Sequence, residues 1–268
     1  MDSDAGLAAE GGPAKDGTQV LRRAARILRS VAQTGAHGTA LADIARSHGL
    51  ARTTAHRILR CLADEGLLEQ GEDDRRYRVG RLLHELGMAP GASAAEIAHW
   101  RPVIEAVAQR TGVTAYLMRR SGIEAVCLVK VDGSGVIRFV PVEVGQRRLL
   151  GLGAGATALL AALPPAETGE LIRTIAPGLR GHPRVSPQSL RAAVDLVRKT
   201  GFSMSQGTVA EHGFGLGLVV PAEGHPPHLA LAIAAHASAV TESAISDWKR
   251  ILREELARGL EGWMPHPR

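Results

Sequence analysis

Apolar residues recur every three or four positions through the early part of the chain, the spacing of helices with one buried face. This pattern predicts one helix over residues 19–33 and a shorter pair of helices within residues 39–62. A turn at His48-Gly49-Leu50 joins the pair. Two short helices joined by a tight turn are typical of a helix-turn-helix motif.

A hairpin pattern follows the three helices. Strand-like residues 67–70 and 77–79 flank the charged sequence GEDDRR, as in a β-hairpin with a polar tip. Three helices followed by a two-stranded wing predict a winged helix-turn-helix domain over residues 19–80. Helical patterns then continue on both sides of Pro90-Gly91, so we expect a linker helix region over residues 81–100.

The second half of the chain mixes strand and helix patterns. Ser186 followed by Pro187 is a typical N-cap and first position of a helix. The mixed order predicts an α+β fold in which helices cover an antiparallel sheet over residues 101–263. The strand candidates are 113–119, 123–131, 135–141, 202–209, 216–220 and 229–236, and the helix candidates are 157–163, 167–175, 186–201 and 241–257.

The composition is that of a folded protein with an aliphatic core. The 268 residues are 45% hydrophobic but only 3% aromatic, so alanine, leucine and valine must fill most of the core. A chain of this length supports two domains. No apolar run is long enough to span a membrane, and the acidic start of the chain does not resemble a signal peptide. We therefore expect a disordered tail over residues 1–18, no membrane contact and a cytoplasmic location.

The positive charge is concentrated in one segment. Residues 1–18 have a net charge of −3, residues 19–63 have +7 from eight arginines and Asp43, and the remaining residues contribute +1 to the total of +5. A solvated surface usually mixes both signs, whereas a phosphate-binding module concentrates positive charge. The predicted helix-turn-helix therefore has the charge expected of a DNA-binding domain.

The exposed face of the second helix of the pair carries the strongest candidates for DNA contact, because the start of a recognition helix reaches base edges. Arg52 and His56 are candidates for reading guanine, and Arg57 is a candidate for anchoring a phosphate. One arginine on the first helix and two on the wing are further candidates for backbone contacts. The complete set is Arg52, Thr53, His56, Arg57, Arg60, Arg22, Arg76 and Arg78.

Motifs for metal, nucleotide or catalytic chemistry are missing from the sequence. We expect Cys61 on the inner side of the second helix of the pair and Cys127 in a strand. Two isolated thiols form neither a zinc cluster nor a disulfide framework. The histidines form no HExxH motif, and the chain has no GxSxG motif for a nucleophilic serine. Gly151-x-Gly153-x-Gly155 lacks the GxGxxG spacing of a dinucleotide site. We therefore expect no metal and no cofactor.

Segments in both halves of the chain are characteristic of one group of proteins. In the first half these segments are Val20-x6-Ile27-Leu28, LADIARSHGLARTTAHRILRCLADEGLLEQ and YRVGRLLHELG. In the second half they are Arg101-Pro102-Val103, Lys130-Val131, residues 144–148, ATALLAALP and the glycine-rich strand before Pro221. They resemble the IclR (isocitrate lyase regulator) family of transcription factors. The resemblance implies a winged-helix domain, a linker helix and a GAF-like domain that binds a small effector, assembled as a homodimer or homotetramer.

The effector pocket that this resemblance implies has few polar side chains. The chain has Gly153-Ala154-Gly155-Ala156-Thr157 where the family often has Thr-Ala-x-Gly-Lys, and aliphatic residues where binders of small carboxylates tend to present Cys and Ser. A carboxylate would lose about 1–3 kcal/mol for each missing hydrogen bond. We therefore expect an effector that is larger or more apolar than a simple oxo-acid. The predicted pocket residues are Gly153, Ala154, Gly155, Leu216, Gly217, Ala232, Ala234 and Met118.

The sequence thus predicts a regulator rather than an enzyme. It would bind a short pseudo-palindrome in double-stranded DNA, and a small organic effector would change the spacing or orientation of its two winged helices through the linker. The alternative is a small-molecule-binding metabolic enzyme whose basic helical region serves only in assembly. Retention on heparin and loss of duplex binding with rising salt distinguish the two.

Overall fold

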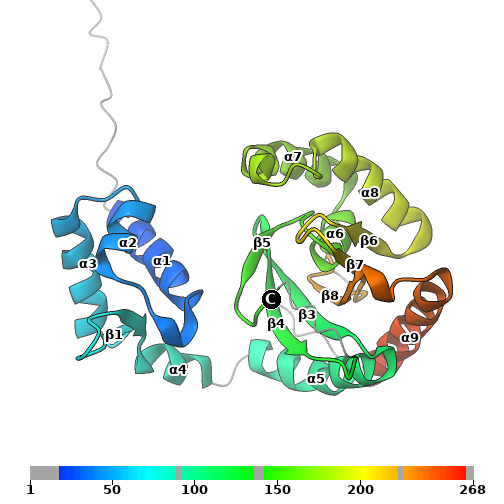
Figure 1. Cartoon of the computed structure of the whole chain (residues 1–268), viewed down its shortest axis with the longest axis horizontal. Coiled ribbons are helices and arrows are strands. Elements are labelled where there is room, and N and C mark those ends of the chain that lie inside the picture. The colour runs from blue at the N-terminus through cyan, green and yellow to red at the C-terminus, as the bar shows by residue number, and fades with distance from the viewer. Residues whose placement is uncertain (1–17, 89–91, 136–141, 223–225, 264–268) are drawn as a thin grey trace, which may run out of the picture. The chain divides into compact units, whose positions relative to one another are not determined.

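The computed structural model describes residues 18–88, 92–135, 142–222 and 226–263. The chain divides into two compact units, one up to residue 89 and one from residue 90 (Figure 1). Within the described ranges, no helix combines the length and the hydropathy needed to cross a membrane.

The N-terminal unit is a winged helix-turn-helix, as the hydrophobic pattern predicts. The turn between the paired helices passes through Gly49, whose φ of 61° is in the left-handed region that glycine adopts without strain. The two strands of the wing are antiparallel, with Leu68 opposite Val79. In chain order the elements are α1 (Gln19–Ala32), η1 (Gly35–His37), α2 (Leu41–Ser47), α3 (Arg52–Asp64), β1 (Leu68–Gln70), β2 (Tyr77–Val79) and α4 (Arg81–Met88).

A single apolar core holds these elements together. The segment before α2 is tied to the wing, because the backbone groups of Thr39 and Tyr77 exchange two hydrogen bonds of 2.9 Å. Cys61 was expected on the inner side of this helix, and that expectation is wrong. Cys61 is exposed because it lies beside the stripe of buried residues on α3. The buried core residues are Ile27, Val31, Ile44, Ile58, Leu59, Leu62, Leu68 and Tyr77.

Within its described residues, the C-terminal unit is built on a six-stranded antiparallel sheet with the strand order β5-β4-β3-β8-β7-β6. This confirms the predicted α+β class. Its helices are α5 (Ala92–Thr111), α6 (Ala154–Ala161), α7 (Pro165–Ile175), η2 (Ala176–Gly181), α8 (Pro187–Thr200), η3 (Ala237–Ala239) and α9 (Glu242–Leu260). Its strands are β3 (Thr114–Ser121), β4 (Glu124–Val131), β5 (Arg147–Leu149), β6 (Ser203–Gln206), β7 (Gly213–Val219) and β8 (Leu229–His236).

Helices cover both faces of this sheet (Figure 1). On one face, α5 and α9 pack against large side chains of the central strands, such as Leu117, Leu216 and Leu231. On the other face, α6 lies on β7 and β8, and α7 and α8 pack beside it. The two faces differ because successive residues of a strand point to opposite sides.

The α6 face of β7 and β8 carries only small residues at its centre. Gly215 and Gly217 alternate with the large residues of β7, and they lie opposite Ala234 and Ala232 of β8. A Cβ added at Gly217 would lie only 3.2 Å from the backbone of Ala154 at the start of α6. These glycines therefore let the helix approach the sheet closely, because no side chain separates the two backbones.

Most of the predicted elements of this unit are present, with shifted ends. Ser186 caps α8 as expected: its hydroxyl accepts a hydrogen bond from the Ser189 backbone N–H, and Pro187 is the first helical residue. β5 was not predicted, because three residues are too few to show a strand period. The strand candidate at 135–141 lies, from residue 136 on, outside the described residues. α5 runs continuously across the predicted boundary at residue 100.

Candidate nucleic-acid interface and ligand pocket

The outer face of α3 is a row of exposed polar and cationic side chains. Arg52 begins the helix and has no acidic residue in the first turn. Arg60 lies near the other end, with its Nε 3.9 Å from a carboxylate oxygen of Asp64. The predicted contacts Arg52, Thr53, His56, Arg57 and Arg60 are all exposed. They lie on one helix, so a major groove could receive them together.

A second basic surface lies between α1 and the turn before α3. A shallow groove there is lined by Arg22, Arg23 and Arg26 from α1 and by His48 and Gly49 from the turn. Three guanidinium groups so close together produce a positive potential suited to a phosphate backbone. Sequence reasoning selected only Arg22 from this group as a site residue.

The wing arginines bond within the chain. Arg76 Nη1 donates a 3.0 Å hydrogen bond to the Gly38 carbonyl oxygen, and Arg78 Nε donates one of 2.8 Å to the Ala36 carbonyl oxygen. Arg78 also forms an ion pair with Asp74, whose pKa falls from 3.8 to about 2 because it accepts this hydrogen bond. Both arginines therefore hold the wing against the segment before α2.

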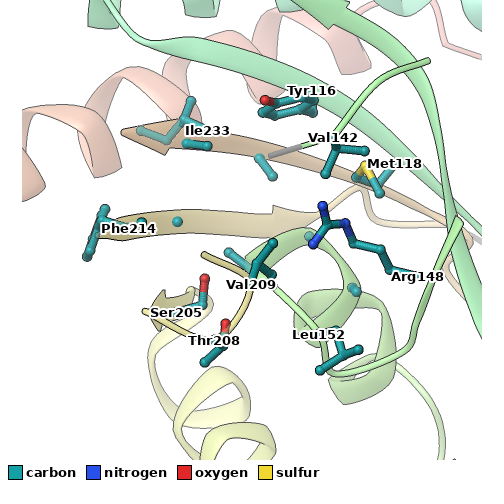
Figure 2. A pocket seen from close by; sticks show the side chains of 18 of the residues that line it. Tyr116, Met118, Val142, Arg148, Leu152, Ser205, Thr208, Val209, Phe214 and Ile233 are labelled. Carbon is teal, nitrogen blue, oxygen red and sulfur yellow. The ribbon is translucent and has the colours of Figure 1, made fainter. Parts of the chain in front are cut away.

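The C-terminal unit contains a pocket between the sheet and the start of α6, with about 520 Å³ of empty space that includes its opening to solvent (Figure 2). Residues from β3, β5, β6, β7 and β8 contribute to its walls. Six of the predicted pocket residues line it: Gly153, Ala154, Gly155, Ala232, Ala234 and Met118. Leu216 is fully buried in the core on the α5 face, and Gly217 packs beneath α6 rather than along the pocket wall.

The pocket is more polar than the sequence predicted. Tyr116, Arg148, Ser205 and Thr208 also line it, so hydroxyl and guanidinium donors are present (Figure 2). These four residues were not among the pocket residues predicted from the sequence. These donors come from β3, β5, β6 and the segment after β6, not from the segments where family binders present Cys and Ser.

Two hydroxyl groups of the pocket are buried with no hydrogen-bond partner among the described residues: Tyr116 Oη and Thr208 Oγ1. Burial raises the pKa of the Tyr116 hydroxyl above its ordinary value, because the phenolate would lose its hydration. Tyr116 is therefore a neutral donor. A buried hydroxyl without a partner costs stability, so a polar ligand that pairs with it would recover that cost.

Arg148 brings positive charge to the same pocket. Its side chain extends from β5, and its guanidinium points into the space between Val142 and Val209 in Figure 2. Burial lowers the pKa of this guanidinium, and the nearby Tyr116 hydroxyl acts in the opposite direction. An arginine remains cationic at neutral pH even so. Among the described residues, the lining therefore combines apolar and neutral polar side chains with one cation.

The start of α6 adds backbone donors. Gly153, the N-cap residue, has a φ of 86° and provides no side-chain hydrogen bond to the helix. The first N–H groups of a helix lack partners within the helix and carry a partial positive charge. Gly153, Ala154 and Gly155 line the pocket, so the start of α6 forms part of its wall.

The fold and these two sites define a helix-turn-helix protein whose second domain contains a pocket. Residues 20–72 match the IclR helix-turn-helix domain, and residues 92–258 match the domain described as bacterial transcriptional regulator IclR C-terminal. The chain belongs to the IclR family of transcriptional regulators. It is a regulator rather than an enzyme, so the metabolic-enzyme alternative is wrong.

Named relatives agree with this assignment, and solved structures share the fold. The chain is 33% identical to the glycerol operon regulatory protein of Streptomyces coelicolor, over 69% of this chain and 72% of that protein. It is 24% identical to the transcriptional repressor IclR of Escherichia coli, over 88% and 86%. The fold is similar to an IclR transcriptional regulator from Alicyclobacillus acidocaldarius, with a TM-score of 0.73, 24% identity and coverage of 90% and 96%. It is also similar to an IclR homolog from Microbacterium hydrocarbonoxydans complexed with 4-hydroxybenzoate, with a TM-score of 0.71, 23% identity and coverage of 91% and 100%.

Proposed function

We propose that the protein binds a pseudo-palindromic operator through α3 of two subunits and that a small organic effector in the C-terminal pocket controls this binding. The observation that carries the effector control is the pocket itself. It contains buried hydroxyl groups without partners among the described residues, and it lies in the unit that does not contain the helix-turn-helix. The solved homolog with 4-hydroxybenzoate supports the binding of a small molecule by this type of domain.

The DNA contacts follow from the exposed face of α3. We assign Arg52, Thr53 and His56 to base edges, because they lie in the first turns of the helix. Arg57 and Arg60, together with Arg22 on α1, are assigned to phosphates. Arg76 and Arg78 bond to backbone carbonyl oxygens of the chain, so we assign them a supporting role in which they fix the wing.

Within the C-terminal unit, the sheet connects the pocket to α5. The residues of β3 alternate between the pocket and the core that α5 shares with α9. Near the start of α5, the buried Glu96 carboxylate lies 2.6 Å from His228 Nε2 and 3.7 Å from Arg119 Nη1, which joins the helix to β3 and to the residue before β8. A shift of β3 and β8 on effector binding would therefore move α5, which follows the DNA-binding unit in the chain.

We further propose a domain at 19–80 that binds DNA, a linker region at 81–100 and an effector domain at 101–263, assembled as a homodimer or homotetramer. A pseudo-palindromic operator requires two copies of α3 related by twofold symmetry. Bacterial operators are cytoplasmic, so we assign the protein to the cytoplasm.

Genome-wide mapping of bound DNA tests this function. We expect enrichment of one short inverted repeat, and we expect purified protein to bind that repeat with an affinity that falls steeply as salt rises. Cross-linking on the repeat should capture at least two subunits. Binding that shows no sequence preference, or occupation by a single subunit, would contradict the proposal.

A further inference from the structure

We propose that the effector is a small organic acid whose carboxylate is bound by the Arg148 guanidinium and the Tyr116 hydroxyl, with an apolar body in the rest of the pocket. This inference rests on the proposed effector control, because it names the chemistry of the effector. The inference rests on the side chains that line the pocket of this protein. It differs from the more apolar effector that we expected from the sequence.

The charge of the pocket favours an anion. Among the described residues that line it, Arg148 is the one side chain with a full charge, and none is Asp or Glu. The space in front of the guanidinium is bounded largely by apolar groups, where an ionic attraction is stronger than in water. An arginine can also donate two parallel hydrogen bonds to one carboxylate, which is why it recognises this group well.

The Tyr116 hydroxyl supplies a second donor for the same group. Tyr116 is only 3% exposed, its hydroxyl has no partner among the described residues, and it lines the same pocket as Arg148. A carboxylate only accepts hydrogen bonds, so it satisfies both the guanidinium and the hydroxyl. A cationic ligand would be repelled by Arg148, and a ligand with donors alone would leave the guanidinium without an acceptor.

The remaining walls define the body of the ligand. Met118, Leu152, Val209 and Phe214 offer apolar contacts, and the alanines and glycines leave room for a compact group (Figure 2). Ser205 and Thr208 form another polar wall on β6 and the segment after it, but both are neutral. The cation therefore determines which end of the pocket binds the carboxylate.

Matched pairs of acids and amides test the proposal with the full chain. Butyrate, hexanoate and benzoate, each at millimolar concentration, are compared with butyramide, hexanamide and benzamide at constant ionic strength, and the thermal unfolding midpoint is recorded. The pairs share their shape and differ in charge, so the comparison isolates the anionic group. We expect at least one acid to raise the midpoint and its amide to raise it much less.

Variants assign the effect to the two donors. Arg148→Met should weaken binding of that acid by about tenfold or more, as expected when a charged hydrogen bond is lost. Tyr116→Phe should weaken it less, and Arg148→Lys should restore part of it. Arg147→Met is the matched control, because Arg147 lies next in sequence but pairs with Glu124 at 2.8 Å and does not line the pocket. It should keep the response to the acid even if its midpoint without ligand falls.

Three results would overturn the proposal: no acid stabilises the wild type, an amide stabilises it as much as its acid, or Arg148→Met keeps the full response. DNA binding is measured separately on the operator. An acid that binds through Arg148 but leaves operator affinity unchanged would contradict the effector control and leave the carboxylate site standing. A neutral ligand that changes operator affinity would contradict the carboxylate site and leave the effector control standing.

Discussion

Tyr116 and Leu117 are neighbours on β3 whose side chains lie on opposite faces of the sheet. Tyr116 lines the pocket, whereas Leu117 is fully buried in the core that α5 and α9 share. A ligand that displaces Tyr116 must also displace the backbone that carries Leu117, because packed interiors leave little free space. This pair therefore places the pocket and α5 on the two sides of one strand.

The first prediction concerns Arg52 on the exposed face of α3. Arg52→Ala should weaken operator binding by about 1–3 kcal/mol and relax the preference at one base pair, because a side chain that reads a base edge discriminates between bases. Affinity is measured on the operator and on variants with single base-pair changes. Arg173→Ala is the charge-matched control, since Arg173 is exposed on α7 in the C-terminal unit. Equal weakening on every sequence would instead assign Arg52 to a phosphate.

The contact between α5 and α9 gives a prediction about stability. A Cβ on Gly259 would lie 2.4 Å from the ring of Trp100, which is fully buried and cannot rotate away. Gly259→Ala should therefore lower the free energy of unfolding of the C-terminal unit by about 1–3 kcal/mol, the usual cost of overpacking a core. Urea unfolding followed by tryptophan fluorescence measures the change.

Gly169→Ala is the control for this glycine substitution. Gly169 lies inside α7, and a Cβ there meets no other atom within 4 Å. Alanine should raise the stability by about 0.5–1 kcal/mol, because glycine loses more conformational freedom in a helix. If Gly169→Ala lowered the stability as much as Gly259→Ala, close packing at Gly259 would not explain the loss.

The wing gives a prediction about pH. Folding lowers the pKa of Asp74 from 3.8 to about 2, so the folded state binds this proton less readily than the unfolded state. The stabilisation is therefore present above pH 3.8 and is lost as the pH falls towards 2. Unfolding of wild type and Asp74→Asn is compared between pH 5 and pH 2, and the difference in stability should shrink over this range. A constant difference would show that Arg78 does not stabilise the ionised form.

The two thiols should differ in reactivity. Cys61 is exposed, whereas Cys127 is buried, and burial raises the pKa of the Cys127 thiol from 9.0 to about 12. Thiolates react and thiols do not, so a disulfide reagent at pH 8 should modify Cys61 quickly and Cys127 only after unfolding. Mass spectrometry of the labelled peptides identifies the modified residue. Rapid labelling of Cys127 in the folded protein would show that the sheet opens readily near the pocket.

The sequence predicts the helix-turn-helix better than the pocket for a physical reason. The spacing of apolar residues along α3 can be read from that segment alone. Ile58 and Leu59 identify the buried face of the helix, and Arg52 and Arg57 identify its exposed face. In a strand, a shift of one residue exchanges the two faces. That is why Leu216 was predicted in the pocket, whereas its neighbour Gly215 lines it.

The donors of the pocket depend on contacts between distant segments. Arg148 lies on the three-residue strand β5, and only the pairing of β5 with β4 at the edge of the sheet brings it to the pocket that Tyr116 also lines. Neither residue stands out in a local pattern. Arg148 was included in a segment that resembles the family, but a resemblance in sequence does not show which side chains point into a pocket.

The central claim is that an occupant of the C-terminal pocket controls the helix-turn-helix. The most direct test measures the dissociation constant of the full chain for its mapped operator, with and without the carboxylate that stabilises it most, in wild type and in Arg148→Met. We predict that the carboxylate changes the dissociation constant of the wild type by about fivefold or more, as is typical of coupled sites, and leaves that of Arg148→Met almost unchanged. A wild-type dissociation constant that does not respond to a carboxylate bound in the pocket would contradict the account.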